Sequence, residues 1–386
     1  MNLSVRIVVV SLLALSAARA VAQQEPYDSP AALTGARAID ALLLRRLGEL
    51  KIPPARICSD GVFLRRAYLD VIGTLPTAKE AREFLQDQSP AKRSALIDRL
   101  LERDEFADYW AMKWANLLRV KAEFPINLWP NAAQAYSRWI RTAIKANKPY
   151  DEFARELLTA SGSNFYVPEV NFYRALQGRG ADVTAQAVAL TFLGQRTALW
   201  PKDRLAGLAG FFAQVGYKAT AQWKEEIVYW DPGIDVAHAT SRPAGAGAVF
   251  PDGAPAVIPP GQDPRAVFAD WLTSPENPCF ARVMVNRIWS WLLGRGIVHE
   301  PDDFRPDNLP VNEALLALLE KEFVASGFDV KHVFRLVLNS QTYQMSPLPP
   351  GRSPEAAANF AFYPLRPIEA EVLIDALDQI TGTSEK

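Results

Sequence analysis

The stretch from residue 263 to residue 345 constrains the fold most strongly, because its apolar and aromatic side chains recur every three or four residues. This interval matches the period of about 3.6 residues of an α-helix with one buried face. The clearest case is the run from Pro278 to Leu293, in which one side of a helix carries Phe280, Met284, Ile288 and Trp291. The fold is therefore predicted to be mainly α.

The predicted helices fall into two blocks. In the first block, residues 30–220, proline and glycine separate amphipathic runs such as the one from Ala36 to Leu50. The second block comprises residues 263–386. Between them, residues 221–262 are rich in Gly, Pro and Ala and lack helical spacing, which predicts an irregular linker or a small β excursion. A length of 386 residues fits two helical domains of about 150 residues each.

Residues 1–22 have the pattern of a signal peptide. Arg6 precedes an apolar run from Ile7 to Ala18, and Ala20-Val21-Ala22 supplies the small residues that favour cleavage before Gln23. The apolar run is shorter than the roughly 20 residues that span a bilayer as a helix. We therefore expect a periplasmic or secreted protein with no membrane span after the signal is cleaved.

Short motifs in the second block resemble those of a known family. In chain order they are Asp270-Trp271-Leu272, Asn286-Arg287-Ile288-Trp289, Gly294-Arg295-Gly296, Asp302-Asp303-Phe304-Arg305-Pro306 and Ser340-Gln341-Thr342-Tyr343. This series is similar to domain of unknown function 1553, part of a two-domain family first noticed in planctomycetes and often joined to cytochrome c modules. Relatives commonly continue further, so the resemblance implies that the domain is truncated at Lys386.

The first block resembles the partner domain of that family, domain of unknown function 1549. The resemblance lies in the segments from Phe63 to Thr77 and from Leu96 to Val120, which combine a helix, a proline turn, another helix and paired tryptophans. It implies two helical domains and the company of polysaccharide-processing or redox proteins. It implies no particular reaction.

One segment departs from many relatives, in which it contains Cys-X-X-Cys-His. That motif attaches a c-type haem through two thioether bonds and an axial imidazole. Here the same flanking sequences, Phe192-Leu193-Gly194 and Gly207-Leu208-Ala209-Gly210-Phe211-Phe212, enclose QRTALWPKDRLA, which contains neither cysteine nor histidine. We therefore expect no covalent haem and no other cofactor, although the protein can still bind a haem protein as a partner.

A polar cluster in the second block is the candidate binding site. Its members are Asn286, Arg287, Trp289, Asp302, Asp303 and Arg305. In the simpler interpretation the cluster is architectural: Arg287 pairs with Asp303 and joins a helix to a loop, because a buried guanidinium needs a carboxylate. In the alternative, the cluster binds carbohydrate or hydrolyses it, which requires two facing carboxylates without fixed counter-ions beside Trp289 and Trp291.

The sequence predicts no metal site. The acidic loop is the one that contains Asp302-Asp303-Phe304-Arg305-Pro306. Pro301 stiffens it, and the alternating oxygen ligands and glycine of a calcium loop are missing there. The three histidines, His238, His299 and His332, form no zinc-binding motif.

Two further pairs of residues are of interest. Arg66 and Asp70 lie one helical turn apart, and their spacing predicts a structural ion pair. Cys58 and Cys279, the only cysteines, either form a disulfide in an oxidising compartment or remain two separate buried thiols. The sequence favours the separate thiols, since pairing does not follow from spacing.

Two functions from different classes remain. The preferred one is an exported interaction or scaffold module with protein partners in the cell envelope. The alternative is a carbohydrate-binding or hydrolase-like protein that uses Arg287, Asp302 and Asp303. Nucleic acid is discounted as a partner, because a net charge of -1 provides no overall attraction for phosphates.

Overall fold

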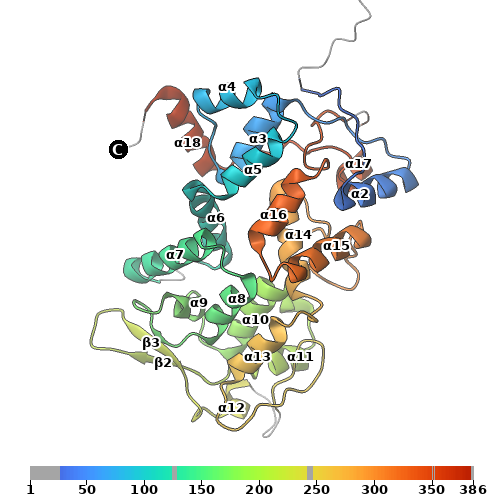
Figure 1. The fold of residues 1–386 in the computed structure, drawn as a ribbon. Coiled ribbons are helices and arrows are strands. Elements are labelled where there is room, and N and C mark those ends of the chain that lie inside the picture. Colours follow the sequence, from blue (N-terminus) through green and yellow to red (C-terminus); the bar gives the residue numbers. More distant parts are fainter. Residues whose placement is uncertain (1–26, 124–127, 241–246, 350, 352, 384–386) are drawn as a thin grey trace, which may run out of the picture.

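The computed structural model describes residues 27–123, 128–240, 247–349, 351 and 353–383. Helices dominate, and one small sheet completes the regular structure of these residues (Figure 1). The predicted mainly α fold is confirmed. The predicted signal peptide, residues 1–22, lies outside the described residues.

The N-terminal part consists of five helices connected by short turns. They are α2 (Ala38–Glu49), α3 (Asp60–Ile72), α4 (Ala78–Gln86), α5 (Lys92–Leu101) and α6 (Asp104–Leu117). Helix α3 ends at Gly73, whose φ is 68°, and a Cβ there would lie 2.7 Å from the Tyr109 ring. Helix α4 begins with a capping box, in which Thr77 and Glu80 satisfy each other's backbone N–H groups.

The middle of the chain contains shorter helices and the sheet. Its helical elements are α7 (Pro130–Lys145), α8 (Tyr150–Thr159), η1 (Pro168–Val170), α9 (Asn171–Arg174), α10 (Ala181–Leu193), η2 (Thr197–Leu199), α11 (Lys202–Ala209) and α12 (Val236–Thr240). The strands β1 (Gly162–Ser163), β2 (Val215–Ala219) and β3 (Glu226–Trp230) pair antiparallel in the order β1-β3-β2. The predicted β excursion therefore exists, but only β3 lies within the predicted linker, since β1 and β2 both precede residue 221.

The C-terminal part again consists of helices. They are α13 (Pro264–Leu272), α14 (Phe280–Leu293), α15 (Glu313–Ala325), α16 (Val330–Asn339), α17 (Pro354–Ala358) and α18 (Ala370–Thr381). The predicted long helix from Pro278 is α14, and it begins two residues later than expected, after an Asn277 side chain that accepts from the N–H groups of Cys279 and Phe280. None of the helices in the described part of the chain has the length and hydrophobicity of a membrane span.

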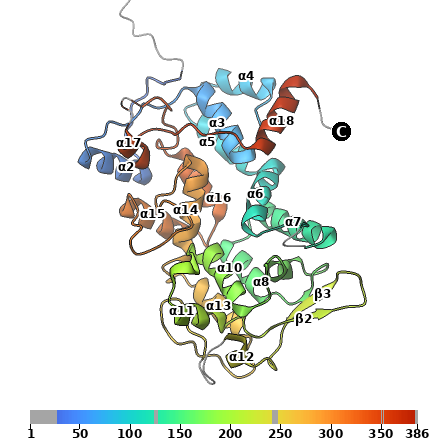
Figure 2. The ribbon, with the colours of Figure 1, turned by 180° about the vertical axis from the view of Figure 1, so that it is seen from behind.

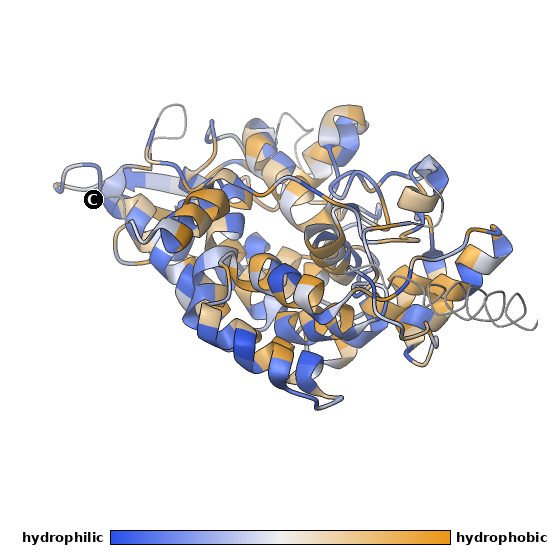
Figure 3. Cartoon of the chain, turned by 90° about the horizontal axis from the view of Figure 1, so that it is seen from above, coloured by the Kyte–Doolittle hydropathy of each residue, from blue (hydrophilic) through white to orange (hydrophobic). Residues whose placement is uncertain are grey.

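Elements from the two ends of the chain pack together. Helix α15 contacts α2, and α16 contacts α5, so α2–α5 and α16–α18 occupy one end of the molecule (Figures 1 and 2). Helices α8–α13 and the sheet occupy the other end, with α6, α7, α14 and α15 between them. The helices carry hydrophobic and hydrophilic residues on different faces (Figure 3). Their buried residues form one continuous core.

Aromatic side chains form the centre of this shared core. Trp110 of α6 packs against Trp291 of α14, with 5.1 Å between ring centroids, and against Phe334 of α16, at 4.6 Å. Trp110 and Trp114 are both buried, as their helical spacing predicts. Aromatic pairs of this kind contribute about 0.5–1.5 kcal/mol each beyond the burial of their area.

Candidate functional site

Arg287 of α14 is a buried guanidinium that is fully used within the protein. Its side chain is 2% exposed, and its Nε lies 2.6 Å from Asp302 Oδ1. Its Nη atoms donate to the carbonyl oxygens of Leu190 and Thr191. These carbonyls belong to the last turn of α10, where no further backbone N–H group can satisfy them. Arg287 therefore connects α14, the end of α10 and the acidic loop.

Asn286 fixes the start of the acidic loop. Its Nδ2 donates to Val298 O at 3.0 Å, and its Oδ1 accepts from Val298 N at 2.9 Å. The turn before Val298 leaves no room for a side chain at Gly296. A Cβ there would lie 2.2 Å from Val298 O and 2.9 Å from Asn286 Nδ2. The Asn286-Arg287 and Gly294-Arg295-Gly296 motifs are thus parts of one loop anchor.

The remaining members of the predicted cluster also make contacts within the protein. Asp302 pairs with Arg287, which differs from the predicted Arg287–Asp303 pair because Asp303 instead lies 3.0 Å from Arg305 Nε. Trp289 is fully buried, edge-on to Phe360. Both carboxylates have an arginine counter-ion, whereas the hydrolase interpretation requires two facing carboxylates without fixed counter-ions.

Arg66 and Asp70 of α3 are both buried, but they do not pair with each other. Arg66 Nη1 donates to the carbonyls of Tyr343, at 2.5 Å, and Met345, at 2.9 Å. Asp70 Oδ1 pairs with Arg366 Nη2 at 2.5 Å. The predicted ion pair within one helix is not formed. Both side chains point toward the C-terminal segment, which offers them buried partners.

Asp70 is the centre of a hydrogen-bond network. Besides Arg366, its carboxylate accepts from the hydroxyls of Tyr343, at 2.9 Å, and Tyr363, at 2.7 Å. Burial, together with the charge of Asp70, raises the pKa of both tyrosines, so both phenols stay protonated and act as donors. The guanidinium of Arg66 lies 3.6 Å from the centre of the Tyr363 ring.

Asp40 makes a similar connection that the sequence did not reveal. This residue of α2 is 2% exposed and accepts from the N–H groups of Gln341 and Thr342 and from the Thr342 hydroxyl, at 2.9–3.0 Å. The Ser340-Gln341-Thr342-Tyr343 motif thus contacts buried carboxylates on two N-terminal helices, Asp40 on α2 and Asp70 on α3.

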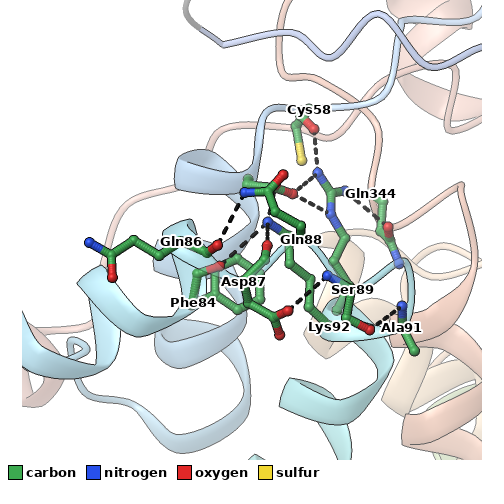
Figure 4. Close-up of polar contacts among 11 residues, drawn as sticks. Cys58, Phe84, Gln86, Asp87, Gln88, Ser89, Ala91, Lys92 and Gln344 are labelled. Atoms are coloured by element: carbon green, nitrogen blue, oxygen red, sulfur yellow. Dashed lines mark hydrogen bonds and ion pairs between the residues drawn. The ribbon is translucent and has the colours of Figure 1, made fainter.

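Both cysteines are free thiols among the described residues, Cys58 buried and Cys279 partly buried. Burial raises the pKa of each thiol. Around Cys58 the polar contacts are structural: Arg93 donates to Cys58 O, Asp60 and Gln344, while Lys92 reaches carbonyls at the end of α4 (Figure 4). The part of the chain described by the structure contains no cluster of His, Cys, Asp and Glu suited to a metal ion.

A concave surface lies next to the Asp70 network. This groove, of about 650 Å³, is lined by parts of α3, α6 and α14 and by residues of the segment 347–372. Trp291, Tyr109, Leu348 and Leu365 provide much of its apolar lining. Its volume falls in the range of about 300–1,000 Å³ that is typical of ligand sites.

The charges in the groove are mostly positive. Arg65, Arg66, Lys113 and Arg366 line it, whereas Asp70 and Glu369 are its two carboxylates. Asp70 pairs with Arg366, and Glu369 contacts the Lys113 ammonium. Burial, supported by Arg366, lowers the pKa of Lys113 to about 8, so this ammonium is still mostly protonated at neutral pH. The groove can bind an apolar and negatively charged group, but it offers no unpaired carboxylate for acid–base chemistry.

Most of this groove could not be predicted from the sequence. Of its charged residues, only Arg66 and Asp70 were singled out, and Lys113, Arg366 and Glu369 were not. The segment Leu365-Arg366-Pro367-Ile368-Glu369 is a signal in retrospect, since it combines apolar and charged residues directly before a helix.

Comparison with known families gives two matches. Residues 38–198 are similar to PSCyt2, a protein of unknown function (DUF1549), and residues 264–386 are similar to PSD1, a protein of unknown function (DUF1553). Neither a curated protein nor a solved structure matches the chain. The two matches coincide with the two blocks in which the sequence motifs lie.

Proposed function

Because this chain belongs to the family that joins a DUF1549 domain to a DUF1553 domain, we propose that it is an interaction module of the cell envelope. In this proposal it is exported by its N-terminal signal and works beside polysaccharide-processing or redox partners. It carries no covalent haem of its own, since the segment from Gln195 to Ala206 has no cysteine or histidine. It contacts its partners through the groove.

The observation that carries this proposal is the pairing of every carboxylate in the groove with a cation. A hydrolase acting on sugars needs one acid and one base or nucleophile that face the substrate. Asp70 and Glu369 are both neutralised within the protein. The apolar lining and the exposed leucines at the rim are instead typical of a surface that buries part of a partner.

Replacing Leu365 by Arg is expected to reduce partner binding at least about tenfold, because it removes an apolar contact from the rim of the groove and puts a strongly hydrated side chain in its place. Leu365 is 80% exposed, so the substitution does not disturb the core. The measurement is affinity purification from the periplasmic fraction, with the recovered proteins quantified by mass spectrometry.

Leu199→Arg is the matched control. Leu199 is 76% exposed but lies in η2, which connects α10 and α11. These two helices lie at the opposite end of the molecule from α3 and α18 (Figure 1). This variant should recover the same partners as the wild type. Equal recovery by the wild type and the Leu365→Arg variant would contradict a role for the groove.

A further inference from the structure

Lys113 is a partly buried cation whose ion pair, among the described residues, is with one carboxylate. Its side chain is 17% exposed and contacts Glu369, whose side chain is 43% exposed. The lowered pKa of Lys113 reflects first its burial and then the neighbouring Arg366. A desolvated ammonium needs a counter-ion, and here the counter-ion approaches from the solvent side of the groove.

Glu369 is attached to a loosely packed element. It directly precedes α18, which buries only Val372 and Ala376. The same helix leaves Leu373, Ile374, Leu377 and Ile380 exposed by 44–70%. A side-chain hydrogen bond joins α18 to the body of the protein, from Gln379 Nε2 to Leu75 O at 3.1 Å. The Lys113–Glu369 contact is therefore one that a ligand can replace without disrupting the core.

The charge of the groove identifies what replaces it. Asp70 already binds Arg366 and two tyrosines, so it supports the charge of Lys113 only through space and not by direct contact. When Glu369 moves away, Lys113 lines the groove beside the other cations without a carboxylate in direct contact. A negatively charged group on a ligand then replaces the counter-ion that Lys113 has lost. The lining around Trp291 and Leu348 accommodates an apolar part of the same ligand beside it.

We propose that the groove binds a partner segment with a carboxylate next to apolar side chains, and that Glu369 occupies the position of that carboxylate in the free protein. This inference rests on the proposed function, because it names the chemistry of the partner that the groove accepts. Glu369 then acts as an internal competitor: the bound carboxylate pairs with Lys113, and Glu369 is released into solvent.

The test uses two fluorescent probes that share one aromatic body. 1-Anilinonaphthalene-8-sulfonate carries a negative group, and N-phenyl-1-naphthylamine has the same rings without it. Glu369→Gln is expected to tighten binding of the sulfonate about fivefold, because a partly exposed ion pair no longer competes. The neutral probe should bind both proteins equally. Lys113→Met, combined with Glu369→Gln, should remove the gain.

Glu371→Gln is the matched control. Glu371 lies two residues further along, in the first turn of α18, and affects Lys113 only through its charge. It should change sulfonate binding less than about twofold, since the effect of an uncontacted surface charge is small. If Glu371→Gln tightens binding as much as Glu369→Gln does, net charge explains the gain and the inference is wrong.

Two other outcomes separate this inference from the proposed function. If Glu369→Gln changes the binding of both probes equally, or of neither, while Leu365→Arg still weakens both, the groove binds ligands without selecting a negative group. The inference then fails and the proposed function stands. If Leu365→Arg leaves both probes unaffected, the groove is not their binding site and both proposals fail. Circular dichroism confirms that each variant is folded.

Discussion

Replacing Asp70 by Ala is expected to lower the free energy of unfolding by about 3–5 kcal/mol, the range measured when one partner of a buried ion pair is removed. The reason is the number of groups that depend on one carboxylate. Arg366 loses its counter-ion, and the hydroxyls of Tyr343 and Tyr363 lose their acceptor in a buried site. Denaturation in urea, followed by tryptophan fluorescence, measures the effect.

Asp98→Ala is the control for this prediction. Asp98 also pairs an N-terminal helix with a C-terminal one, since it lies 2.7 Å from Arg335 of α16, but both side chains are exposed, by 53% and 39%. Exposed pairs of this kind contribute less than about 1 kcal/mol. If the two variants were equally stable, Asp70 would not be the connection between α3 and the C-terminal segment that the structure indicates.

Arg287→Ala is expected to have an effect of similar size, about 3–5 kcal/mol. The substitution leaves Asp302 without its counter-ion and leaves the carbonyls of Leu190 and Thr191 at the end of α10 without a donor. Arg287→Lys should recover only part of this loss, because one ammonium does not reproduce the planar arrangement of guanidinium donors. The same denaturation experiment applies to both variants.

Arg305→Ala tests whether the exposed ion pairs of the acidic loop contribute to stability, or only the buried Arg287–Asp302 pair does. Arg305 is 40% exposed and contacts Asp303 and Asp307 from the surface. Its replacement should change the free energy of unfolding by less than about 1 kcal/mol. A large loss from Arg305→Ala together with a small one from Arg287→Ala would contradict the architectural interpretation of the cluster.

The helices were predictable because their signals are local. The spacing of Phe280, Met284 and Ile288 identifies α14, and Thr77 with Glu80 marks the start of α4. The sheet was only partly located, since β2 is short and its pairing with β3 depends on a register that no single strand specifies.

The buried networks were not predictable, because their partners are far apart in the chain. Local spacing suggested that Arg66 pairs with Asp70, yet each residue pairs with a segment nearly 300 positions away. Arg287 pairs with a carboxylate of the acidic loop, but the partner is Asp302 and not the predicted Asp303, since adjacent loop residues point in different directions. The groove was missed for the same reason: Lys113 and Glu369 meet only in the folded protein.

Photo-crosslinking in living cells tests the central claim, that the groove is the surface through which this module binds. A photoreactive phenylalanine derivative replaces Leu365 at the rim of the groove or, in a second variant, Leu199 at the other end of the molecule. The account predicts a covalent adduct with an envelope protein from position 365, weakened by Lys113→Met, and none from position 199. Equal adducts from both positions, or none from position 365, would contradict it.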